Sequence, residues 1–172
     1  MPGFLDRNQA IASLPSLSLL TLAAMTPDIF DVSYHEIEDI RKVGEPPVCD
    51  VAAIASYSAQ IKDAYVLADR YRALGVRIVL GGLHVTARPD EALEHADAIV
   101  TGEGELGWPD LLVDLGAGRL GRVYGPKGRE FDLADAPMPR FDLLEIEHYN
   151  RLTVQTQRAA RGGASSVRRP YS

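Results

Sequence analysis

Cysteine is nearly absent from this chain, because Cys49 is the only one among 172 residues. A single cysteine excludes a disulfide framework and any metal site that needs several cysteines from this chain. The low cysteine content fits a reducing, cytoplasmic setting. We expect Cys49, at the edge of a predicted strand, to be a small buried apolar side chain.

Long apolar runs and an excess of basic charge are also absent. No apolar stretch approaches the ~20 residues of a membrane span, and the N-terminus lacks the basic-then-apolar pattern of a signal peptide. The formal net charge is −6, whereas nucleic-acid binding needs a clustered basic surface. Five arginines between residues 151 and 169 have few stacking aromatics beside them, so RNA or membrane binding by this tail is a disfavoured alternative. We therefore expect neither a nucleic acid nor a membrane as partner, and the sequence leaves any protein partner unknown.

Strand and helix patterns alternate along the middle of the chain, and 46% of the residues are hydrophobic, enough for one core. Short, continuously apolar runs predict strands that are buried on both faces, and apolar residues at helical spacing predict helices between them. The predicted strands are 31–38, at an edge, and 51–56, 76–80 and 97–101; the predicted helices are 15–27, 60–74, 89–95 and 108–115. This order predicts an α/β fold: a flavodoxin-like (Rossmann-like) doubly wound parallel sheet in three αβα layers.

Residues 1–14 contain no strand pattern, although a doubly wound domain should open with a buried strand. We therefore expect the first strand, which is central in a flavodoxin-like sheet, to be missing from this chain. The domain is expected to span residues 1–125. Glycines and prolines in 125–128 and 136–139 break regular structure, so 126–150 is interpreted as an interdomain linker.

Small and polar residues follow three of the predicted strands, at the sheet edge where open α/β sheets bind their ligands. Paired glycines after the second of these strands allow a ligand to approach the backbone. We therefore expect one cleft lined by these three loops. Its candidate binding residues are Ser56, Tyr57, Ser58, Gly81, Gly82, His84, Thr86, Thr101, Gly102, Glu103 and Gly104.

Each of these features also has a simpler interpretation. A Gly-Gly pair is most often a turn, and His84 alone is typical of a solvated or hydrogen-bonded loop histidine. Residues 102–107 match the G-x-G-x-x-G dinucleotide pattern, but Glu103 and Glu105 place negative charge where a pyrophosphate must lie. A phosphoacceptor domain is disfavoured, because Ser56 stands where the aspartate is needed.

Four segments, taken in order, resemble the N-terminal half of B12-binding-domain radical S-adenosylmethionine (SAM) proteins: 15–24, 81–92, 95–105 and 137–144. The resemblance implies cobalamin binding, with the nucleotide tail of the corrinoid in the cleft described above. It implies a role as the N-terminal domain of a methyltransferase-like enzyme. The Asp-x-His-x-x-Gly motif of other cobalamin proteins is absent, so the cobalt is expected to lack that histidine ligand, with His84 at most near the corrin.

In the family, the strand corresponding to Leu152–Arg158 leads into Gly-Cys-x-x-x-Cys-x-x-Cys, whose thiolates hold a [4Fe–4S] cluster that binds SAM. Residues 159–172 contain no cysteine, so the cluster and SAM are expected only in the full-length family, and this chain is expected to be inactive by itself. A stand-alone corrinoid or small-ligand carrier and an inactive fragment remain alternatives.

Residues 151–172 are interpreted as a stub of the radical SAM domain with a frameshifted tail from about residue 159. One permitted back-translation of 159–167, translated from the third base of its first codon, encodes Cys-Pro-Arg-Arg-Cys-Glu-Phe-Cys, which has the family spacing. Sequencing the gene tests this hypothesis, and a next-frame segment without these cysteines would reject it.

Overall fold

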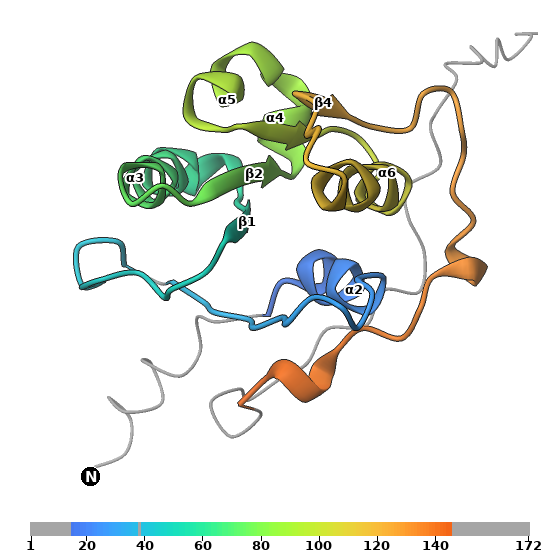
Figure 1. The fold of residues 1–172 in the computed structure, drawn as a ribbon, viewed down its shortest axis with the longest axis horizontal. Coiled ribbons are helices and arrows are strands. Elements are labelled where there is room, and N and C mark those ends of the chain that lie inside the picture. Colours follow the sequence, from blue (N-terminus) through green and yellow to red (C-terminus); the bar gives the residue numbers. More distant parts are fainter. Residues whose placement is uncertain (1–14, 38, 146–172) are drawn as a thin grey trace, which may run out of the picture.

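A four-stranded parallel sheet is the centre of the computed structural model, which describes residues 15–37 and 39–145 (Figure 1). The spatial order is β1 (Val51–Ala55), β2 (Arg77–Gly81), β3 (Ala98–Val100) and β4 (Val123–Tyr124). The predictions for residues 1–14 and 146–172, among them the radical SAM stub and its shifted tail, lie outside the described residues.

Helices cover both faces of the sheet, as the sequence predicts. Ile78, Leu80 and Ile99 pack in one apolar cluster with α3 (Ile61–Ala73), α4 (Leu83–Ala87) and α5 (Pro89–His95). Val79, Ala98 and Val100 have the opposite parity along their strands and pack against α6 (Gly104–Gly116) on the other face. The four parallel strands lie side by side in the order in which they occur along the chain. Because α3 and α6 cover opposite faces of the sheet, the β1–α3–β2 and β3–α6–β4 crossover connections have opposite handedness.

Helix α2 (Leu17–Ala24) lies beside α6, on the same side of the sheet (Figure 1). A Cβ placed on Gly104 would lie 3.4 Å from Leu22 Cδ2, and Trp108 Nε1 donates a hydrogen bond to Thr26 Oγ1 at 2.9 Å. The chain after β4 returns to this helix, because Arg140 N donates to Leu20 O at 3.1 Å. Residues 126–145, in the predicted linker, hold only the short 3-10 helices Leu133–Asp135 and Phe141–Leu143.

Helix α6 begins four residues before the predicted start at Trp108. Glycines have low helix propensity, so the pattern of residues 102–107 does not indicate a helix. Tertiary packing explains the earlier start of α6, because a Cβ on Gly107 would lie 3.0 Å from both Gly125 N and Val100 Cγ1. The absence of a side chain lets the first turns of α6 lie directly against the sheet. Helix α4 was likewise not predicted, because it has only five residues.

The predicted edge strand at 31–38 is wrong. Residues 31–37 form no helix or turn and belong to no strand of the described sheet. A strand is defined by backbone hydrogen bonds to a neighbouring strand. A groove separates residues 31–37 from β1, so the two segments are not paired with each other. Within the described ranges, no helix is long and apolar enough to cross a membrane.

Candidate functional site

The three predicted loops lie next to one another because the strands before them end in register. Ala55 pairs with Gly81, and Gly81 pairs with Val100. Parallel strands bring their carboxyl ends to the same edge of the sheet. The loops after β1, β2 and β3 therefore lie at one edge of the sheet, and the cleft between them stays a prediction.

The loops after β1 and β2 meet at Gly82. Its φ of +110° and ψ of −179° lie in a region that is essentially restricted to glycine. A Cβ built on Gly82 would lie 3.2 Å from Ser56 O and 3.8 Å from Ser56 N. The contact brings two peptide backbones together with no side chain between them. The Ser56 hydroxyl donates to Tyr57 O at 3.1 Å.

Thr86 ties the loop after β2 to the loop after β3. Its hydroxyl accepts a hydrogen bond from Gly102 N at 2.8 Å and donates one to Gly82 O at 3.0 Å. Thr101 in turn donates from its hydroxyl to Tyr124 O at 3.2 Å, which joins the same surface to β4. Two threonine hydroxyls thus hold the loops together by their backbones.

His84 makes its contacts away from these hydroxyls. Its Nε2 lies 3.3 Å from Glu91 Oε1, and its ring packs edge-on against Tyr65 with centroids 6.4 Å apart. Glu91 belongs to α5 and Tyr65 to α3. The structure therefore places this ring among helix side chains. His84 is hydrogen-bonded, but it belongs to α4 and not to a loop, so the interpretation as a loop histidine is wrong in its location.

The remaining predicted residues begin helices. Ser58 opens a short 3-10 helix, Ser58–Gln60, while Glu103 is the N-cap residue and Gly104 the first residue of α6. The contact between Gly104 and Leu22 places this glycine against α2. Of the predicted set, the structure brings together Ser56, Gly81, Gly82, Thr86, Thr101 and Gly102.

Two apolar side chains beside these loops are exposed. Tyr57, which was predicted, is 73% exposed, and Leu83, which was not, is 81% exposed. The available signal for Leu83 was an apolar residue directly after Gly81-Gly82. The surface thus combines backbone amides and carbonyls, small hydroxyls and exposed apolar groups. The described part of the chain contains no group of three or more His, Cys, Asp or Glu side chains placed to hold a metal ion.

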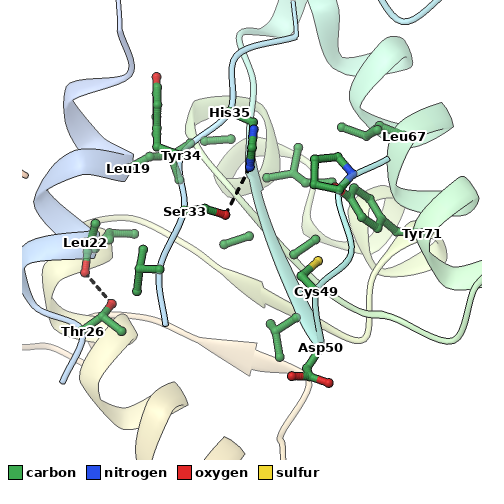
Figure 2. A pocket seen from close by; sticks show the side chains of 18 of the residues that line it. Leu19, Leu22, Thr26, Ser33, Tyr34, His35, Cys49, Asp50, Leu67 and Tyr71 are labelled. Carbon is green, nitrogen blue, oxygen red and sulfur yellow. Dashed lines mark hydrogen bonds between the residues drawn. The ribbon is translucent and has the colours of Figure 1, made fainter. Parts of the chain in front are cut away.

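A groove of about 600 Å³ lies on the other side of β1, and sequence reasoning did not predict it. It runs between β1 and residues 31–37, with α2 and α3 at its sides (Figure 2). Of the predicted binding residues, only Ser56 lines it. Cys49 also lines it and is half-buried, and burial is the main cause that raises the pKa of its thiol.

Comparison with known protein families gives a match over residues 12–112 to the B12 binding domain. The chain belongs to this family. Among curated proteins, the bacteriochlorophyllide d C-8(2)-methyltransferase of Chlorobaculum tepidum is 34% identical over 167 residues, which are 94% of this chain and 34% of that protein.

Two further relatives are also named as methyltransferases. The bacteriochlorophyllide d C-12(1)-methyltransferase of Chlorobaculum tepidum is 33% identical over 65% of this chain and 25% of its own length. An uncharacterized methyltransferase of Synechocystis sp. is 28% identical over 84% of this chain and 27% of its own length. The chain therefore spans about a third or less of the length of these relatives.

Proposed function

We propose that this B12-binding domain holds cobalamin against the carboxyl ends of β1, β2 and β3. In this proposal the domain is the N-terminal part of a methyltransferase of the radical SAM type. Membership of the B12-binding family and the names of three methyltransferase relatives support it. The observation that carries the placement is the contact of Gly82 with Ser56, a backbone floor without side chains.

The residues of this surface fit a corrinoid. A corrin ring is broad and flat, and the glycines Gly81, Gly82 and Gly102 leave the backbone of the loops accessible to it, because they carry no side chains. Its amide substituents need donors and acceptors, which exposed peptide groups and the hydroxyls of Ser56 and Thr101 can supply. Tyr57 and Leu83 expose apolar area that the ring would cover, and burying such area is favourable.

Histidine ligation of the cobalt is not part of this proposal. His84 already interacts with Glu91 and packs against Tyr65, and releasing its ring would forfeit both contacts. We expect hydroxocobalamin bound to the protein to have the same visible spectrum in the wild type and in His84→Ala. An imidazole-type spectrum that disappears in His84→Ala would contradict this expectation.

The finer part of the proposal concerns the reaction. Bound cobalamin supplies a cobalt that can carry a methyl group. The residues described here would orient the corrinoid and cover one of its faces. The [4Fe–4S] cluster and SAM would be held by other parts of a full-length enzyme, as the resemblance implies.

Retention of hydroxocobalamin tests the binding proposal. The protein is mixed with an excess of hydroxocobalamin and desalted, and the visible spectrum of the protein fraction is recorded. We expect about one corrinoid per chain in the wild type and a clear loss in Gly82→Val, whose Cβ would lie 3.2 Å from Ser56 O and would push the loops after β1 and β2 apart. Gly118→Val, beyond the end of α6, is the matched control and should retain the corrinoid. A folded wild-type protein that leaves all hydroxocobalamin in the small-molecule fraction refutes the proposal.

A further inference from the structure

The loop after β4 is a fourth loop at the carboxyl edge of the sheet, although the sequence pattern predicts a linker from residue 126 onward. A Cβ built on Gly125 would lie 2.7 Å from Thr101 Oγ1. A Cβ built on Gly102 would lie 3.2 Å from Pro126 Cδ. Thr101 and Gly102 belong to the surface proposed to hold cobalamin, so the loop after β4 borders that surface directly.

Residues 126–129 form a tight turn whose shape does not require a lysine. Arg129 N donates to Pro126 O at 2.8 Å, which closes the turn. Between them, Lys127 and Gly128 have φ values of +48° and +80°, and positive φ at both central positions is typical of a type I′ turn. Glycine, asparagine and aspartate dominate such turns, whereas Lys127 is the only non-glycine residue with a positive φ in the described part of the chain. Strained backbone of this kind clusters at functional sites, which indicates a function for the lysine side chain.

The charge of the Lys127 ammonium is not balanced by its protein partner. Its Nζ lies 3.5 Å from Asp110 Oδ2 on α6, but Arg129 donates to the same oxygen at 2.8 Å. Two cations therefore share one carboxylate, and the side chain of Lys127 is 66% exposed. Arg129 also donates to Leu106 O at 2.7 Å, so the arginine is fixed to the first turn of α6. The lysine, with one long contact and an exposed stem, can turn toward a ligand.

The neighbouring loops lack a cation for an anionic ligand. The predicted binding residues of the loops after β1, β2 and β3 include no lysine or arginine, and Glu103 among them is acidic. Gly102 follows β3, which lies between β4 and β2, and it places no side chain in the path of the lysine. Neighbouring strands are ~4.8 Å apart, a distance that the four-carbon stem of lysine can span. Lys127 is therefore placed to meet an anionic group of a ligand that covers Gly82 and Gly102.

We propose that Lys127 binds the phosphodiester in the nucleotide tail of the corrinoid and thereby favours complete corrinoids over forms without a nucleotide. The phosphodiester is the anionic group of that tail, and lysine is a flexible point charge suited to phosphate. The inference rests on the proposed function, because it assigns one contact to the cobalamin proposed there. It adds a residue outside the three predicted loops to the binding surface.

Affinities for two corrinoids test this contact. Hydroxocobalamin contains the phosphodiester, whereas aquocobinamide lacks the nucleotide and its phosphate. Dissociation constants for both are measured by visible titration of the 172-residue wild type, Lys127→Asn and Lys127→Arg. Asparagine suits a type I′ turn and carries no charge, so Lys127→Asn should melt no lower than the wild type. We expect it to bind hydroxocobalamin about tenfold more weakly, which corresponds to about 1.4 kcal/mol, with its affinity for aquocobinamide unchanged. Lys127→Arg keeps the charge and should retain most of the affinity for hydroxocobalamin.

Lys42→Asn is the matched control. Lys42 is an exposed lysine at the end of the turn 40–42, ahead of the amino end of β1, and Arg70 from the last turn of α3 donates to Ile40 O in this turn at 3.2 Å. This variant should bind both corrinoids like the wild type.

Two results would overturn the inference while leaving the proposed function intact. The first is equal affinity of the wild type and Lys127→Asn for hydroxocobalamin. The second is an equal loss of affinity for both corrinoids in Lys127→Asn, which would show that the side chain supports the loop and does not contact the phosphodiester. A folded wild-type protein that binds neither corrinoid refutes the proposed function, and this inference with it.

Discussion

Replacement of Gly82 by alanine tests the closeness of the loops after β1 and β2. Gly82 has a φ of +110° and a ψ of −179°, and a non-glycine residue there is strained by about 1–3 kcal/mol. The added Cβ would also lie 3.2 Å from Ser56 O, so one backbone must move by tenths of an ångström. We expect Gly82→Ala to lower the free energy of unfolding by about 2–3 kcal/mol. At ~2–4 °C per kcal/mol for a chain of this length, Tm falls by roughly 4–12 °C.

Gly118→Ala is the control for this prediction. Gly118 has a φ of +68°, but no atom lies within 4 Å of a Cβ built there. It should therefore lose only about 1 kcal/mol through backbone strain and should bind hydroxocobalamin like the wild type. Gly82→Ala should bind it roughly tenfold more weakly, which corresponds to about 1.4 kcal/mol. Thermal melts and titrations of both variants check this. Equal losses of stability in the two, with equal affinities, would refute the reasoning.

Two further predictions concern single polar groups. Thr86→Val removes the hydroxyl that accepts from Gly102 N and donates to Gly82 O, so urea unfolding should show a loss of about 1–2 kcal/mol, and unchanged stability would contradict the bridge between the loops. Tyr65→Phe should cost no stability at neutral pH, because the buried Tyr65 hydroxyl has no hydrogen-bond partner among the described residues and its ring still stacks on His95, with centroids 4.2 Å apart. Burial first, and then the charge of Glu91, raise the pKa of Tyr65 to about 12 from 10.0, so its ionisation favours the unfolded state from pH 10 to 12. Between pH 10 and 12, the free energy of unfolding measured by urea denaturation should therefore fall more steeply in the wild type than in Tyr65→Phe. Equal pH dependence in the two proteins would contradict the raised pKa of Tyr65.

The parts of the fold that the sequence predicts are those whose cause is local. Strands β1, β2 and β3 are continuous apolar runs, and α3 carries apolar residues at helical spacing up to the cap region near Gly75. The edge strand at 31–38 could not be predicted correctly from its alternation, because a strand needs a neighbour and no periodicity reveals whether one is present. The start of α6 depends on Gly107 lying against Gly125, a contact between residues far apart in the sequence.

The candidate site divides in the same way. Its location follows from a general rule about the carboxyl ends of parallel strands, so the three loops were predicted together. The contacts within it depend on side-chain direction and backbone conformation. The pairing of His84 with Glu91 and the exposure of Leu83 are consequences of α4, a helix too short to leave a sequence pattern.

The packing of α2 against α6 has a mechanical consequence for the groove. No hydrogen-bond ladder joins residues 31–37 to β1 among the described residues, so the width of the groove is determined by whatever holds α2 in place. That support is the contact of Leu22 with Gly104 and the hydrogen bond from Trp108 to Thr26. Helix α6 also lines the groove itself through Trp108, Leu112 and Leu115. We therefore expect a displacement of α6, whose first turn follows the loop after β3, to change the shape of the groove as well.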